Sequence, residues 1–127
     1  MKKALLILTL LFFLMGCNTG TNAKNSPQDI TPAEAKELLE ADSSVVIIDV
    51  RTQSEYDAGH IPNAVLLPLD EISNSAAQIM PNLNTTYIIY CRSGNRSAQA
   101  VTLLDQMGYT DLYDLGGIID WPYDIVN

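Results

Sequence analysis

The chain has 127 residues, a length that suits one ordinary domain, and its 7 Lys and Arg against 15 Asp and Glu give a formal net charge of −8. A surface this acidic repels nucleic acid and anionic lipid headgroups, so DNA or RNA binding is not expected. The sequence shows no internal repeat and no second domain.

The first residues are typical of a bacterial export signal. Two lysines precede an apolar run, 4–15, that is shorter than the ~20 residues of a membrane span. The sequence "LMGC" at 14–17 resembles the lipobox of bacterial lipoproteins, a family in which the signal is cut before a cysteine that then carries acyl chains such as palmitate. We therefore expect a lipoprotein signal peptide at 1–16, lipidation of Cys17 and an exported protein anchored to a bacterial membrane. A plain signal peptide is the alternative.

The segment that follows is small and polar. Residues 17–27 show no apolar periodicity and predict a flexible tether to a domain over 28–127. Loss of 1–16 would remove two lysines and leave a net charge of −10. The chain has two cysteines, Cys17 and Cys91. If Cys17 is lipidated, Cys91 has no intramolecular partner, and a lone thiol outside the cytoplasm suggests a function.

Helices and buried strands alternate along the domain. Thr31 can cap a helix, Pro32 suits its first position and Glu34 completes a capping box. The apolar runs "VVIIDV" and "TYIIYC" predict strands buried on both faces. In chain order we expect a strand near 28–30, a helix at 31–42, a strand at 45–50, a helical turn at 52–59, a strand at 64–68, a helix at 69–80, a strand at 86–91, a helix at 95–108, a strand at 111–115 and a short helix at 116–121.

This order predicts a single α/β domain with a parallel sheet covered by helices on both faces. In the helix at 95–108, the side chains expected on the buried stripe are Ala98, Val101, Leu104 and Met107. The pair at 116–117, two glycines, is expected to make a tight strand-to-helix turn.

Cys91 ends a predicted buried strand, and a short loop then leads directly into a helix. Ligands bind at this edge of open α/β sheets, and a helix N-terminus offers unpaired N–H groups and a partial positive charge. Arg92 and Arg96 add further positive charge, and Gly94 permits a turn in which several N–H groups converge. These features favour the thiolate, which is the nucleophilic form. The alternative is a buried structural cysteine.

Three motifs resemble the signatures of single-domain rhodaneses, a sulfurtransferase family: "DVRTQSEYDAGHIPNAVLLP", "YCRSGNRSAQA" and "LGGIIDW". The resemblance spans 28–121 and implies a five-stranded parallel sheet flanked by helices, with no metal and no cofactor. It implies that Cys91 takes sulfur from an anionic donor such as thiosulfate, holds it as a persulfide, and passes it to cyanide, a thiol or a protein acceptor. The substrate-binding residues that it implies are Arg92, Ser93, Gly94, Asn95 and Arg96, with the two arginines steering the donor.

The first motif contains further polar residues. Asp49 and Arg51 end a strand, and Glu55 lies one helical turn later, so we expect a local ion-pair network that shapes the rim of the site. His60 is the only histidine. The resemblance implies a structural role for its segment, and a general base is the alternative.

Two other functions use the same loop. Cysteine phosphatases place an arginine six residues after the cysteine, whereas Arg96 comes one place earlier and Ser97 occupies that position. A shorter loop makes a tighter ring that suits a persulfide sulfur better than a phosphate. A sulfur-carrier or redox-responsive binding module remains the second interpretation.

Overall fold

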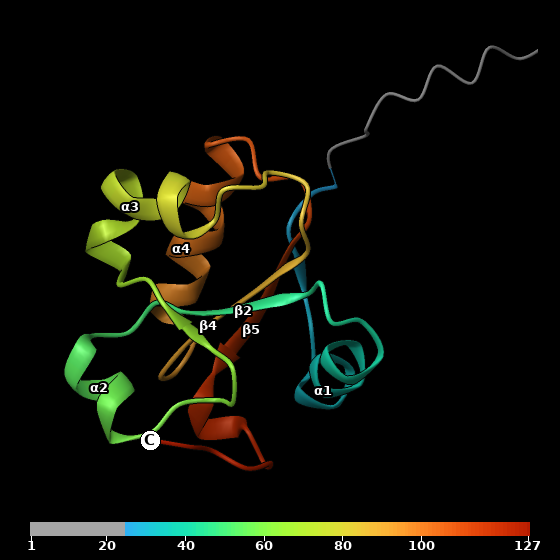
Figure 1. The fold of residues 1–127 in the computed structure, drawn as a ribbon, viewed down its shortest axis with the longest axis vertical. Coiled ribbons are helices and arrows are strands. Elements are labelled where there is room, and N and C mark those ends of the chain that lie inside the picture. The colour runs from blue at the N-terminus through green and yellow to red at the C-terminus, as the bar shows by residue number, and fades with distance from the viewer. Residues whose placement is uncertain (1–24) are drawn as a thin grey trace, which may run out of the picture.

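The computed structural model describes residues 25–127 (Figure 1). The predicted signal peptide, Cys17 and most of the tether lie outside these residues. Within 25–127 no helix has the length and apolar character needed to cross a membrane.

One parallel sheet organises the chain, with strand order β1-β5-β4-β2-β3. The strands are β1 (Gln28–Asp29), β2 (Val46–Asp49), β3 (Val65–Leu66), β4 (Tyr87–Cys91) and β5 (Leu112–Gly117). The helices are α1 (Pro32–Ala41), α2 (Gln53–Ala58), α3 (Ile72–Ile79) and α4 (Asn95–Gln106), with 3-10 turns η1 (Leu69–Glu71) and η2 (Ile118–Asp120). The predicted α/β class, with five parallel strands, is confirmed.

Helices cover both faces of the sheet, with α1 on one side and α3 and α4 on the other (Figure 1). Alternate residues of the central strand point to opposite sides: Ile88 and Tyr90 pack in the cluster on the α1 side, and Ile89 and Cys91 in the cluster on the α3–α4 side. All five residues of β4 are buried, as the continuous apolar run predicts. Cys91 is therefore anchored by the strand at the centre of the sheet.

Local sequence signals explain where several helices begin. Thr31 accepts a hydrogen bond from the N–H of Glu34, and the Glu34 carboxylate accepts one from the N–H of Thr31. This is the predicted capping box of α1. Thr52 and Glu55 make the same reciprocal contacts at the start of α2, where the sequence suggested only a helical turn.

Some predicted details differ from the structure. The helix predicted at 69–80 forms, but its first turn is the 3-10 turn η1 and the α-helix α3 begins at Ile72. On the predicted buried stripe of α4, Val101 and Leu104 are buried as expected, but Ala98 is exposed, and Met107, just past the end of the helix, is exposed too. Ser97 and Ala100 complete the buried stripe. The two glycines at 116–117 belong to β5, because a shift in register opposite Ile89 and Tyr90 lets the strand continue past a local irregularity.

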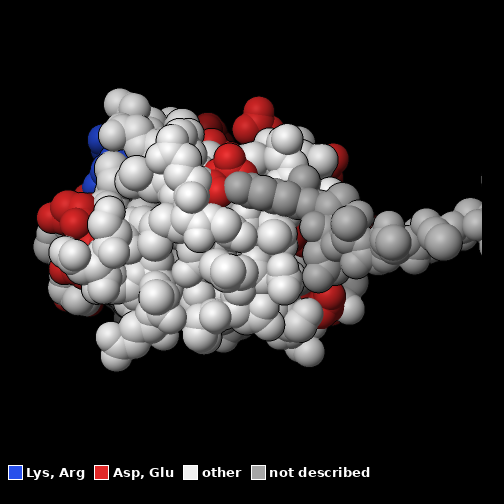
Figure 2. All heavy atoms as spheres, turned by 90° about the horizontal axis from the view of Figure 1, so that it is seen from above, with Lys and Arg blue, Asp and Glu red and all other residues white. Residues whose placement is uncertain are grey.

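The charge on the surface is unevenly distributed. On the face shown in Figure 2, acidic groups lie at both sides and in the upper part, most of the remaining surface is uncharged, and Lys and Arg appear at only one edge. This distribution gives nucleic acid no basic surface on that face.

Candidate active site

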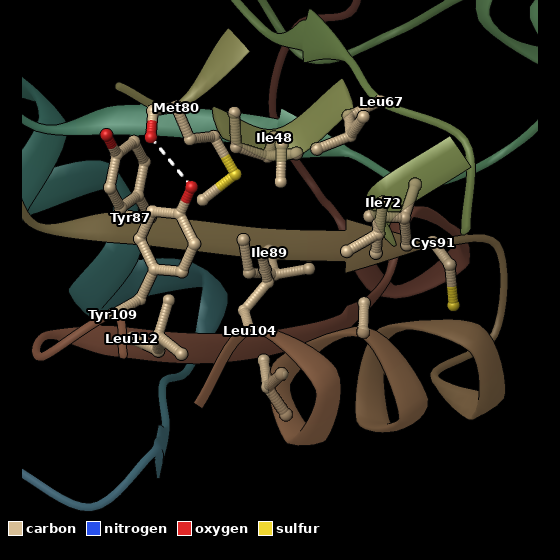
Figure 3. Packing of buried hydrophobic residues seen from close by; sticks show 14 residues of the cluster. Ile48, Leu67, Ile72, Met80, Tyr87, Ile89, Cys91, Leu104, Tyr109 and Leu112 are labelled. Atoms are coloured by element: carbon tan, nitrogen blue, oxygen red, sulfur yellow. Dashed lines mark hydrogen bonds between the residues drawn. The ribbon is translucent and has the colours of Figure 1, made fainter. Parts of the chain in front are cut away.

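Cys91 is the last residue of β4, and the loop that follows it, residues 91–96, ends in the first turn of α4. Figure 3 shows the sulfur of Cys91 pointing from the end of the strand toward the start of α4. The site thus lies at the carboxyl edge of the sheet, where parallel α/β proteins bind ligands.

The thiol of Cys91 is surrounded by hydrogen-bond donors. The N–H of Gly94 donates to Sγ at 3.0 Å. Burial raises the pKa of this thiol, but the nearby backbone N–H groups of Ser97, Gly94 and Ser93, together with the polar side chain of Ser97, outweigh that effect and lower the pKa below its ordinary value. The loop therefore stabilises the thiolate chiefly through hydrogen bonds near a helix N-terminus.

Strand β5 fits closely against this loop. Gly94 has φ +105°, in the left-handed region that favours glycine. A Cβ on Gly117 would lie 2.7 Å from the Cα of Ser93 and even nearer to the carbonyl oxygen of Arg92. That carbonyl also accepts a hydrogen bond from the N–H of Ile119 at 3.2 Å. The absence of a side chain at Gly117 is what allows the loop to rest on the strand.

The two loop arginines differ in their surroundings. Arg92 is exposed, and its guanidinium has no hydrogen-bond or ion-pair partner among residues 25–127. Arg96 is held by Glu55, with Nη1–Oε1 at 2.7 Å and Nη2–Oε2 at 3.0 Å. The pKa of Glu55 is lowered to about 2, mainly by the hydrogen bond from Arg96. Arg92 is thus the loop cation that is free to attract an anion.

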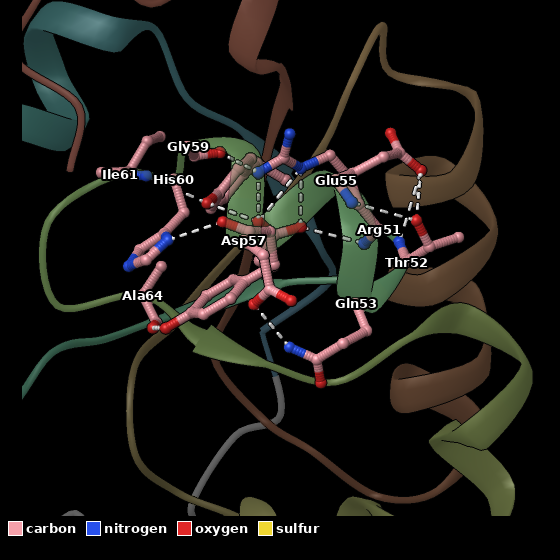
Figure 4. A network of polar contacts seen from close by, with 12 residues as sticks. Arg51, Thr52, Gln53, Glu55, Asp57, Gly59, His60, Ile61 and Ala64 are labelled. Carbon is pink, nitrogen blue, oxygen red and sulfur yellow. Dashed lines mark hydrogen bonds and ion pairs between the residues drawn. The ribbon is translucent and has the colours of Figure 1, made fainter. Parts of the chain in front are cut away.

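A second polar network lies under the site. Arg51 donates to buried Asp49 through Nε at 3.0 Å and Nη2 at 2.7 Å, and to the carbonyl of Gly59 at 2.7 Å (Figure 4). The Tyr90 hydroxyl donates to the same carboxylate at 2.8 Å and accepts from the N–H of Ile61 at 3.1 Å. This network ties β2 and β4 to the segment after α2.

His60 makes structural contacts. Its ring stacks on Tyr56 with centroids 3.7 Å apart, and its Nδ1 lies 2.9 Å from the Tyr56 carbonyl oxygen (Figure 4). Because a carbonyl only accepts, Nδ1 carries the proton. The backbone of His60 also pairs with that of Val126. No hydrogen bond joins His60 to Cys91 in the described part of the chain.

Two residues support the site that the sequence did not single out for it. Ser97 is fully buried, and its hydroxyl donates to the carbonyl of Gly94 at 3.0 Å. In the sequence, Ser97 stands three positions before Ala100 and four before Val101, a spacing that places it on the buried stripe of α4. Tyr90 carries a hydroxyl within an otherwise apolar buried strand, which indicates a buried hydrogen-bond partner for that hydroxyl.

Two open hollows lie beside the ion pairs of the site. One is lined by residues of both ion-pair networks, Arg51 and Arg96, together with Leu69 and Asp70. The lining of the other includes Arg51 and Glu55 as well as the apolar residues Ile119 and Trp121. Within residues 25–127 no group of three or more His, Cys, Asp or Glu side chains is placed to hold a metal ion.

Comparison with known proteins places this arrangement in a family. The Rhodanese-like domain matches residues 31–122. The chain is 38% identical over 73 residues to the "Thiosulfate sulfurtransferase PspE" of Escherichia coli (strain K12), covering 58% of this chain and 70% of that protein. It is 37% identical over 94 residues to a "Sulfurtransferase" of Allochromatium vinosum, covering 73% and 86%.

A solved structure supports the same assignment. The crystal structure of a rhodanese-like domain protein from Staphylococcus aureus matches with a TM-score of 0.67 and 38% identity, covering 76% of this chain and 93% of that one. The order of strands, the cysteine at the edge of the sheet and these matches lead to one conclusion. The chain belongs to the rhodanese-like domain family.

Proposed function

We propose that the protein is a sulfurtransferase that carries sulfane sulfur on Cys91. The observation that carries the proposal is the thiol of Cys91 under the N–H of Gly94, with a lowered pKa, at the start of α4. The similarity to proteins named as sulfurtransferases supports the reaction class.

The chemistry assigns a role to each part of the loop. The Cys91 thiolate attacks the outer sulfur of thiosulfate, the S–S bond of the donor breaks, and sulfite leaves with the electron pair. The loop N–H groups that stabilise the thiolate also suit the negative charge of the persulfide. Cyanide or a thiolate then attacks the outer sulfur, and Cys91 leaves as a thiolate. No external oxidant or reductant is needed.

The test is thiosulfate-to-cyanide transfer by the purified full-length chain and its Cys91→Ser variant. We expect transfer by the wild type and none by the variant, which should retain the fold because the two side chains are similar in size. Equal transfer by both would overturn the proposal. Sulfur that is loaded onto Cys91 but not released to cyanide would favour a sulfur carrier instead of an enzyme.

We also propose that the protein is exported and anchored through lipid on Cys17, because "LMGC" resembles a lipobox. The described chain starts at Asn25, whose N–H donates to the carbonyl of Thr110 ahead of β5. This contact lies where the parallel strands begin, whereas Cys91 lies where they end, so the site would point away from the tether. Cys17→Ser should move the protein from the membrane to the soluble fraction. A wild-type protein with unmodified Cys17 in the soluble fraction would contradict the anchor.

A further inference from the structure

Several large apolar side chains are exposed beside the Cys91 loop. Of the six exposed large hydrophobics in residues 25–127, three, Ile119, Ile125 and Val126, belong to the last nine residues. Ile119 and Ile125 are 63% and 54% exposed. Together with Ile118 and Trp121 they line one of the hollows described above, and we call these four residues the apolar rim.

The apolar rim is held in place and is not a frayed end. The N–H of Trp121 donates to Ile118 at 3.0 Å, and its indole N–H donates to the carbonyl of Asp124 at 3.2 Å. Beyond it, Val126 exchanges two backbone hydrogen bonds with His60, at 2.8 and 2.9 Å. Ile118 and Trp121 are half-buried and pack against the core, and Ile119 and Ile125 extend them into the solvent as one contiguous apolar patch. Contiguous exposed apolar patches are typical of interaction sites.

The rim is joined directly to the reactive loop. The N–H of Ile119 donates to the carbonyl of Arg92, the residue after Cys91. The hollow, of about 330 Å³, is open and does not include Cys91. A cyanide ion cannot occupy the hollow and reach the sulfur at the same time, whereas a cysteine within a polypeptide can do both.

The charges at the rim favour a basic partner. Asp120 and Asp124 lie between the rim residues in sequence, both are exposed, and neither forms an ion pair within 25–127. The Lys36 ammonium is ion-paired with Glu40 at 2.8 Å. Its pKa is raised mainly by Glu40 and to a smaller extent by Asp124. The charged residues in the hollow itself, Arg51 and Glu55, are already paired.

We propose that the apolar rim docks the sulfur acceptor, and that this acceptor is a protein whose cysteine is flanked by apolar and basic residues. The inference rests on the sulfurtransferase function proposed above. In the transfer, the partner's thiolate attacks the outer sulfur of the Cys91 persulfide, the S–S bond to Cys91 breaks, and Cys91 leaves as a thiolate. The acceptor's thiol proton goes to solvent, and the net oxidation state is unchanged.

The test uses three acceptors with sulfur-loaded full-length protein, freed of thiosulfate. They are cyanide, a short peptide with cysteine among leucines and lysines, and a peptide of equal length with cysteine among serines and glutamates. The wild type should transfer sulfur to the basic peptide about five- to tenfold faster than to the acidic one. In Ile119→Ser/Ile125→Ser, the ratio of the basic-peptide rate to the cyanide rate should fall about fivefold. Leu83→Ser, another exposed apolar residue, is the matched control and should leave that ratio unchanged.

The outcomes separate the two proposals. If wild-type protein releases sulfur to cyanide but transfers it equally fast to both peptides, the docking inference is overturned and the sulfurtransferase function stands. If no sulfur is released to cyanide or to either peptide, the enzymatic function fails and the docking inference with it. A dimer, or binding to phosphatidylglycerol vesicles, that the double serine variant abolishes would assign the rim to a second copy or to the membrane, and would also overturn the inference.

Discussion

Arg96, in the reactive loop, and Glu55, in α2, form a two-pronged ion pair across 41 residues of sequence. The same Glu55 carboxylate accepts hydrogen bonds from Thr52 at the start of α2. Glu55 therefore links the cap of one helix to the loop that carries Cys91. The charge of Arg96 is largely committed to this contact.

The ion pair makes a prediction about stability in acid. The pKa of Glu55 falls from 4.5 to about 2 in the fold, so its contribution is present above pH 4.5 and lost as the pH falls toward 2. Glu55→Gln should lower the free energy of unfolding by about 1 kcal/mol near pH 7. Denaturant unfolding at pH 7, 5 and 2 should show the difference from wild type shrinking with acidity. A difference that stays constant down to pH 2 would contradict this role.

The two arginines should have separable effects on the donor. Arg92→Ala should raise the KM for thiosulfate and weaken its dependence on salt, because the unpaired guanidinium attracts the anion and is screened over ~8–10 Å. Arg96→Ala should lower transfer from charged and neutral donors alike, because it loosens the loop. The measurement is steady-state kinetics with both kinds of donor at two ionic strengths. Equal effects of the two substitutions on every donor would be evidence against this division of roles.

Adjacent glycines of β5 provide a matched pair of variants. Gly117→Ala places a methyl group against the Arg92 carbonyl and the Ser93 Cα, and should cost about 1–3 kcal/mol while displacing the loop. Gly116→Ala strains a residue with φ +82° but meets no atom within 4 Å. Both variants should lose stability, yet only Gly117→Ala should shift the pH profile of Cys91 alkylation. An unchanged profile in Gly117→Ala would show that the loop does not depend on this contact.

The thiol itself should titrate below an ordinary cysteine. Hydrogen bonds from Ser97, Gly94 and Ser93 overcome the effect of burial on the Cys91 pKa. The rate of iodoacetamide alkylation should therefore reach its midpoint at lower pH in the folded protein than in the same protein in urea. Ser97→Ala removes the hydroxyl that donates to the Gly94 carbonyl and helps to lower the Cys91 pKa, so the folded midpoint should move upward. Identical midpoints for folded and unfolded protein would exclude an activated thiolate.

The sequence predicted those features that depend on neighbouring residues. The capping box of α1 and the buried run of β4 are read from a few adjacent positions, and the reactive loop follows from its place between a strand and a helix. Contacts between segments that are distant in the sequence could not be predicted from neighbouring residues. The pairing of Arg96 with Glu55 and the fit of Gly117 under the loop require the sheet to be assembled. The buried stripe of α4 was misassigned at Ala98 because Ser97, a polar residue, takes the buried position.

The central claim is that Cys91 itself carries the sulfur. Its most direct test is mass spectrometry of the full-length protein after incubation with thiosulfate, with peptide mapping before and after cyanide. We predict a gain of one sulfur atom, located on the peptide that contains Cys91, lost on addition of cyanide and absent from Cys91→Ser. An adduct located elsewhere in the chain, or one that persists in Cys91→Ser, would contradict the claim.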